Sequence, residues 1–153
     1  NPLHVAADDA AFGAYLNFLH FGEATLTFPQ TLVLRYTRFE PEERRLPQAV
    51  DDYTRWFFAR LKTLESLLAK QEYLCAGRFT AADVSVGYAL LLAEFLGLEA
   101  GFKPAVAAYW ARLKARPAFV RAQAAERQAA IAQDVSPLPA PLQDVAALSM
   151  PKA

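Results

Sequence analysis

Apolar residues recur every three or four positions along most of the chain, which is the spacing of one face of an α-helix. No stretch alternates apolar and polar residues for long enough to indicate a strand, so the sequence predicts an all-helical fold. The first helix is predicted to begin after Asp8 and Asp9, because either carboxylate can cap a helix start. Pro29 is expected to bend or break this helix, since proline has no N–H and crowds the carbonyl group four residues back. The helical spacing resumes at Leu32, so one long, kinked helix is predicted.

A second helix is predicted to begin near Pro47, because the fixed φ angle of proline suits the first turn of a helix. Its buried face is marked by apolar residues at helical spacing, namely Val50, Tyr53, Phe57, Leu61, Leu64 and Leu68. Trp56 and Phe58 widen this face beyond what one partner helix needs, so the helix is expected to pack on two sides. Further helices are predicted to open at Pro104 and Pro117.

The most informative segment surrounds Thr80 and Asp83, which have the spacing of a capping box. In such a box each side chain accepts the backbone N–H of the other residue, so a helix is predicted to start here. Phe79 before the cap and Val84 after it are placed to form a hydrophobic staple. From Val84 to Leu98 nearly every position is apolar, so this helix is predicted to have no solvent face and to lie at the centre of the fold.

Composition narrows the class of protein. A length of 153 residues favours one domain with a substantial core. Sixteen Lys+Arg balance sixteen Asp+Glu, so the basic excess that nucleic-acid binding normally needs is missing and no such partner is expected. The longest apolar stretch is interrupted by Ser85, Gly87 and Glu94, so no membrane span is expected. Cys75 is the only cysteine and cannot form an internal disulfide, which gives no support to an oxidising compartment; we expect a cytoplasmic protein.

Few residues indicate chemistry of their own. His4 and His20 lie too far apart for a metal site, and neither has a cysteine or carboxylate at ligand spacing, so no metal is expected. The sequence holds no GxSxG, GxxxxGK or HExxH motif, which removes the commonest hydrolase, phosphate-binding and metalloprotease patterns.

Three segments together resemble one family. YLCAGRFTAADVSVGYALL (residues 73–91) resembles the capped central helix of the C-terminal domain in the glutathione S-transferase superfamily. AYWARLKARPAF (residues 108–119) is similar to that domain's next helix and its Arg-Pro-Ala junction, and AYLNFLHFGEATLTFP (residues 14–29) to its first helix. The resemblance covers roughly residues 9–130, and the three segments in this order form a fairly specific combination.

The resemblance implies a bundle of five to six helices around a buried central helix. Residues 1–8 would be the remnant of an interdomain linker, residues 9–133 the helical substrate-binding domain, and residues 134–153 a proline-rich, extended or partly disordered tail. The family places a thioredoxin-like domain before these helices, and nothing in this sequence reads as its β-α-β start. The chain opens at Asn1 and its only methionine is Met150, so we expect a piece of a longer gene product.

The resemblance also implies a function. The full-length protein is expected to be a transferase that conjugates glutathione to apolar electrophiles in detoxification, with glutathione held mainly by the absent domain. This chain would supply the apolar wall, contain no catalytic residue and be inactive alone. The resemblance implies a homodimer, with the first two helices meeting the partner subunit. The expected substrate-binding residues lie on the first helix: Tyr15, Phe18, Leu19, Gly22, Glu23 and Leu26.

Alternatives remain at this stage. An aromatic stripe at this spacing also suits plain core, and His20 suits either a ligand contact or a surface position. Domains of this fold also serve as non-catalytic interaction modules that assemble protein complexes, and fold alone does not decide between the two functions. The module hypothesis predicts a charged or filled surface beside the first helix, whereas the transferase hypothesis predicts a small-residue gap there.

Overall fold

The computed structural model describes residues 3–136, and within this range all regular structure is helical, which confirms the predicted fold class. The elements, with η for π- and 3₁₀-helices, are α1 (Phe12–His20), η1 (Phe21–Thr27), α2 (Phe28–Leu34), η2 (Arg35–Phe39), η3 (Glu42–Arg44), α3 (Pro47–Leu68), α4 (Ala81–Phe95), η4 (Glu99–Gly101), α5 (Pro104–Lys114) and α6 (Pro117–Ala132). The chain divides into two compact units, Asn1–Trp110 and Ala111–Ala153. Most of the predicted tail, from residue 137 on, lies outside the described residues.

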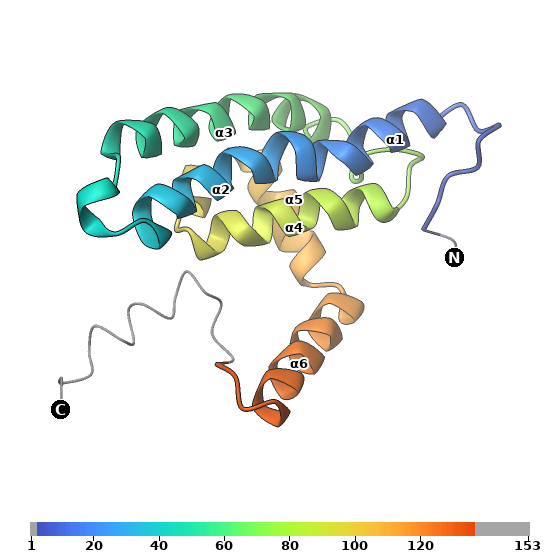
Figure 1. The fold of residues 1–153 in the computed structure, drawn as a ribbon. Coiled ribbons are helices and arrows are strands. Elements are labelled where there is room, and N and C mark those ends of the chain that lie inside the picture. Colours follow the sequence, from blue (N-terminus) through green and yellow to red (C-terminus); the bar gives the residue numbers. More distant parts are fainter. Residues whose placement is uncertain (1–2, 137–153) are drawn as a thin grey trace. The chain divides into compact units, whose positions relative to one another are not determined.

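The elements α1, η1, α2 and η2 form one continuous helix (Figure 1, blue to cyan). The single long helix that was predicted therefore continues through Pro29, and η1 just before this proline is π-helical. The backbone N–H of Phe28 bonds the carbonyl of Glu23, five residues back instead of four. This wider turn gives the ring of Pro29 the room that an α-turn withholds.

The start of this long helix is set by Asp9. Its carboxylate accepts the backbone N–H of Ala11 at 2.7 Å, and its carbonyl accepts the N–H of Phe12 at 2.9 Å. The helix begins at Phe12, after the two aspartates as predicted, but its N-cap residue is Ala11, and Asp9 bonds the chain just ahead of the first turn.

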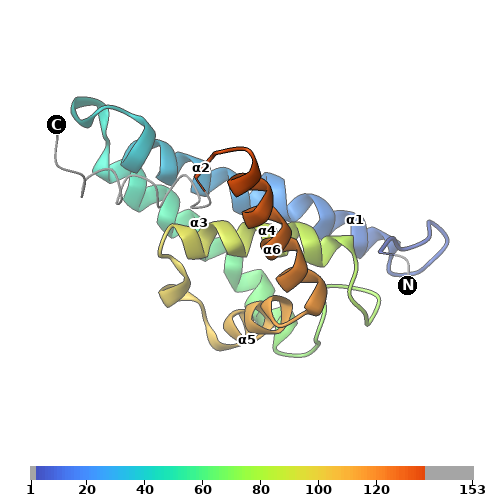
Figure 2. The same cartoon turned by 90° about the horizontal axis from the view of Figure 1, so that it is seen from below.

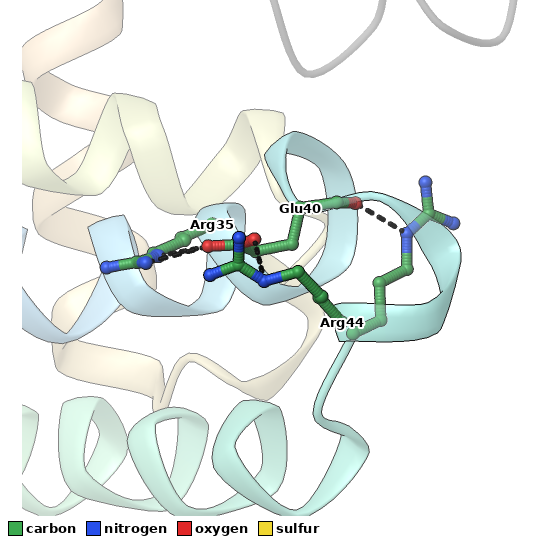
Figure 3. A network of polar contacts seen from close by, with 4 residues as sticks. Arg35, Glu40 and Arg44 are labelled. Atoms are coloured by element: carbon green, nitrogen blue, oxygen red, sulfur yellow. Dashed lines mark hydrogen bonds and ion pairs between the residues drawn. The ribbon is translucent and has the colours of Figure 1, made fainter.

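The other end of the long helix is fixed by a network around Glu40 (Figure 3). Arg35 donates from Nε to one carboxylate oxygen at 2.7 Å, and Nε of Arg44 lies 3.2 Å from the other oxygen. Arg45 donates to the backbone carbonyl of Glu40 at 3.2 Å. The hydrogen bond to Glu40, together with its charge, raises the pKa of Arg35 above its ordinary value. The network holds the turn that leads from η2 towards α3.

The helix α3 begins at Pro47 as predicted and packs against α2. Its predicted face is buried at Phe57, Leu61, Leu64 and Leu68, whereas Val50 and Tyr53 are half-buried. Of the second face expected from Trp56 and Phe58, Phe58 is half-buried with its ring beside Gly101, whereas Trp56 remains 41% exposed in the described part of the chain.

The helix α4 lies beside α1 and η1 in both views (Figures 1 and 2). Residues on its inner side are fully buried, among them Val86, Ala89 and Leu90. The prediction that this helix has no solvent face is wrong, because Val84 is 50% exposed and Tyr88 is 57% exposed. The two residues lie one helical turn apart and form an apolar strip on the outer side of an otherwise buried helix.

The helix α5 begins at Pro104, as predicted, and its start is capped from a distant part of the chain. The backbone N–H groups of Ala105 and Val106 donate to the two carboxylate oxygens of Glu65, at 3.1 and 3.0 Å. A carboxylate here satisfies two of the unpaired N–H groups at the helix start and favours its positive end. In the second unit α6 begins at Pro117, also as predicted. No helix among the described residues has the length and apolar character needed to cross a membrane.

Candidate functional site

A groove of about 340 Å³ runs along the outer side of α1 and η1 and is open to solvent. Its described lining residues are Leu16, Asn17, His20, Phe21, Ala24 and Thr25. Four of these six residues are apolar or carry a methyl group beside their polar atom, and none is an aspartate, glutamate, lysine or arginine. Leu16, Phe21 and Ala24 give the groove an apolar wall, and Asn17, His20 and Thr25 add hydrogen-bonding groups, a mixture usual in small-molecule sites.

The opposite side of the same helix packs closely against α4 at Gly22. This glycine is buried, and a Cβ atom placed on it would lie 2.5 Å from the backbone carbonyl carbon and oxygen of Ser85. The hydroxyl of Ser85 donates to the carbonyl oxygen of Leu19 at 2.6 Å. The close approach at Gly22 and this hydrogen bond hold the groove-bearing segment at a fixed distance from α4.

A second polar link between the two helices comes from Gln30. Its side-chain amide donates to the carbonyl of Leu26, in the same long helix, at 2.9 Å and to the carbonyl of Ala89 in α4 at 3.0 Å. Gln30 is fully buried. This residue could not be predicted from the sequence, because one glutamine in a helical stretch carries no signal of which carbonyl groups it will meet.

The six residues predicted to bind substrate lie mainly beneath the groove. Tyr15, Phe18, Gly22 and Leu26 are buried, Leu19 is half-buried, and Glu23 is exposed on η1. None of the six is among the described residues that line the groove. Phe18 packs edge-on against the groove residue Phe21, with ring centroids 6.0 Å apart. The buried members of this predicted set thus lie on the inner side of the helix and support the groove from inside the domain.

The capping box at the start of α4 is present, and its carboxylate does more than cap the helix. The fully buried Asp83 accepts the backbone N–H of Thr80 at 2.8 Å and the hydroxyl of Thr80 at 3.1 Å. It also accepts the backbone N–H of Leu74 at 3.1 Å and the phenol of Tyr109 at 2.9 Å. The carboxylate of Asp83 therefore links three parts of the domain, which are the loop before α4, the first turn of α4, and α5. Phe79 of the predicted staple is half-buried and its ring meets that of Tyr73.

Residues near the beginning of the sequence dock beside this cap. The carbonyl of Leu3 accepts the N–H of Ala81, the first residue of α4, at 2.8 Å. The guanidinium of Arg78 donates to the carbonyl of His4 at 2.8 Å, and Val5 is buried. The predicted linker segment is therefore held against the start of the buried helix.

The lone cysteine sits in the same region. Cys75 is buried, and its sulfur lies 3.6 Å from the hydroxyl oxygen of Thr80. Burial raises the pKa of the Cys75 thiol above its ordinary value, and the nearby charge of Asp83 adds to the increase. A buried thiol with a raised pKa is a poor nucleophile, which agrees with a packing role. No cluster of His, Cys, Asp and Glu suited to a metal ion occurs among the described residues.

The arrangement is that of an all-helical domain whose buried helix starts at a capping box. Residues 47–121 match the family model described as "Glutathione S-transferase, C-terminal domain". Residues 47–121 therefore belong to the C-terminal all-helical domain of the glutathione S-transferase superfamily. The predicted family is thereby confirmed.

Solved structures support the same assignment. The glutathione transferase URE2P6 from Phanerochaete chrysosporium, in complex with oxidized glutathione, is 30% identical with a TM-score of 0.67, and the match covers 76% of this chain and 54% of that one. URE2P8 from the same organism, with oxidized glutathione, is 25% identical with a TM-score of 0.66, covering 78% and 54%. For Ure2p5, cocrystallized with 1-(S-glutathionyl)-2,4-dinitrobenzene, the identity of 23% supports the fold alone, with a TM-score of 0.72 and coverage of 86% and 62%. A search of curated protein sequences finds no match to this chain.

Proposed function

We propose that this chain is the helical, substrate-binding half of a glutathione transferase that conjugates glutathione to apolar electrophiles. The groove on α1 and η1 is its apolar wall, and Phe18 and the other buried residues of the predicted stripe hold that wall in place. Glu23 stands at the surface of the same segment. Glutathione and the group that activates its thiol belong to a thioredoxin-like domain outside this sequence, so the chain alone is inactive.

The observation that carries the proposal is the chemical character of the groove. Its described lining has no charged residue of the Asp, Glu, Lys or Arg type, and it is open on the outer side of the first helix. An interaction module would be expected to present a charged or filled surface there. The oxidized glutathione bound to the 30% identical URE2P6 supports glutathione as the co-substrate. A cytoplasmic role in detoxification belongs to the same proposal, and the lone, buried Cys75 is compatible with a reducing compartment.

The test is a titration of the ¹⁵N-labelled chain with S-hexylglutathione, followed by NMR. The hexyl group imitates an apolar substrate that has already joined glutathione. We expect the largest amide shifts at groove residues such as Leu16, Phe21 and Ala24, with weak affinity because half of the site is missing. Shifts confined to the outer strip of α4, or no shifts at millimolar ligand, would count against the proposed wall.

The dimer is proposed from an exposed aromatic cluster on α2 and α3. The rings of Tyr53 and Trp56 stack with centroids 5.6 Å apart, and Phe28 meets both edge-on at 6.4 and 6.1 Å. Phe28 and Trp56 stay largely exposed, and the guanidinium of Arg60 lies 5.8 Å from the ring of Trp56. Aromatic residues with a neighbouring arginine are enriched in the energetically important part of protein interfaces.

Replacing Trp56 by alanine is expected to weaken self-association by at least tenfold, since an aromatic residue at the centre of an interface contributes about 2 kcal/mol or more. Sedimentation velocity across a range of protein concentrations measures the effect. Tyr88→Ala, which removes an exposed aromatic residue from α4, is the matched control and is expected to leave association unchanged. Equal effects of the two substitutions would move the interface away from the cluster.

A further inference from the structure

Two polar side chains line the first part of the groove segment, together with Leu16 and Phe21. Asn17 and His20 lie three positions apart on α1, so they project from the same side of the helix about one turn apart. Both are exposed, and neither side chain has a hydrogen-bond partner within the part of the chain that the structure describes. A carboxamide donates two hydrogen bonds, and an imidazole donates at least one in either protonation state. The groove therefore presents unoccupied donors to whatever binds in it.

The charge around these donors limits what they can select. The described lining contains no lysine or arginine to pair with an anionic group. Glu23 is exposed on η1, next in sequence to the groove residue Ala24, and it is not among the described lining residues. The half-buried Thr25 adds only a neutral hydroxyl. An uncharged acceptor such as a nitro or carbonyl oxygen fits these surroundings better than a carboxylate.

We infer that Asn17 and His20 are specificity-determining residues, which favour apolar electrophiles whose ring carries an uncharged hydrogen-bond acceptor. The inference rests on the proposed function, since it assumes that substrate lies in this groove. The apolar ring of the substrate lies against Leu16, Phe21 and Ala24. Its acceptor oxygen accepts hydrogen bonds from the side chains of Asn17 and His20. The role inferred for both residues is in the choice of substrate. A ligand without an acceptor leaves these donors unpaired once water is displaced, and this penalty is the source of selectivity.

The experiment compares two ligands on the full 153-residue chain. NMR titrations give the dissociation constants of S-(2,4-dinitrophenyl)glutathione, which carries nitro oxygens, and S-hexylglutathione, which has no acceptor on its alkyl group. The double substitution Asn17→Leu and His20→Phe is expected to reduce the preference for the dinitrophenyl ligand about tenfold, the effect of losing two ordinary hydrogen bonds. His4→Phe replaces the other histidine, which is exposed outside the groove, and is expected to leave the preference unchanged.

Each outcome decides the inference. An unchanged preference in the double variant, with both ligands still shifting groove residues, overturns the role of Asn17 and His20 and leaves the proposed function standing. The absence of groove shifts with either ligand overturns the proposed function and the inference with it. Both substitutions are at exposed positions, and retained dispersion of the amide spectrum shows that the variants fold. The single variant Asn17→Leu, which keeps the imidazole, is expected to lose part of the preference.

Discussion

Replacing Asp83 by alanine lowers the free energy of unfolding by about 4 kcal/mol, because it leaves several buried donors without an acceptor. The carboxylate accepts hydrogen bonds from Thr80, Leu74 and Tyr109, and it is fully buried. The capping box alone would account for about 1 kcal/mol. The remainder comes from the links to the preceding loop and to α5. Chemical denaturation monitored by circular dichroism measures the difference.

Two further variants separate these contributions. Tyr109→Phe removes one of the hydrogen bonds to Asp83 and is expected to cost about 1 kcal/mol. Asp51→Ala removes an exposed carboxylate from α3 and is the matched control, with an expected change within about 0.5 kcal/mol. If Asp83→Ala costs no more than Tyr109→Phe, the carboxylate is a helix cap and does not join the surrounding elements. If the alanine variant fails to fold, Tyr109→Phe still tests the link to α5.

Replacing Gly22 by alanine destabilises the domain by about 2 kcal/mol, although alanine is the better helix former. The new methyl group would lie 2.5 Å from backbone atoms of Ser85, which cannot rotate away as the end of a flexible side chain could. Relief therefore requires α4 and η1 to separate, which stretches the Ser85–Leu19 hydrogen bond. The steric cost exceeds the gain of up to about 1 kcal/mol in helix propensity.

Gly13 provides the matched control for this prediction. It lies in α1 of the same long helix, and nothing is within 4 Å of a Cβ atom built on it. Gly13→Ala is therefore expected to raise stability by about 0.5–1 kcal/mol. We expect the two substitutions to change the free energy of unfolding in opposite directions when both are measured by the same denaturation experiment. A stabilising effect at both positions would show that the contact between Gly22 and Ser85 is not tight.

Much of the fold follows from local signals in the sequence. The prolines at 47, 104 and 117 mark the starts of α3, α5 and α6, because proline is well tolerated in the first turn of a helix. The spacing of Thr80 and Asp83 marks the start of α4, because a capping box depends only on residues three positions apart. Long-range polar links could not be predicted in this way. The cap that Glu65 places on α5 joins residues 40 and 41 positions apart.

The groove was harder to predict than the fold, and the reason is physical. Helical spacing identifies the apolar side of a helix that packs inward, so it selected the buried Tyr15, Phe18 and Leu26. The proposed wall lies on the other side, where apolar and polar residues mix without a period. The π-helical turns of η1 also change which residues share a side, and an α-helical projection cannot follow this change. The one sequence signal near the groove was His20, a polar residue within the first helix.

The central claim, that the outer side of α1 and η1 is an apolar wall for substrate, is tested most directly by intermolecular nuclear Overhauser effects. The measurement uses the isotope-labelled chain with unlabelled S-hexylglutathione. Contacts are expected between the hexyl protons and the side chains of Leu16, Phe21 and Ala24. Contacts from the hexyl group to Val84 and Tyr88 on α4, with none to the groove, would contradict it.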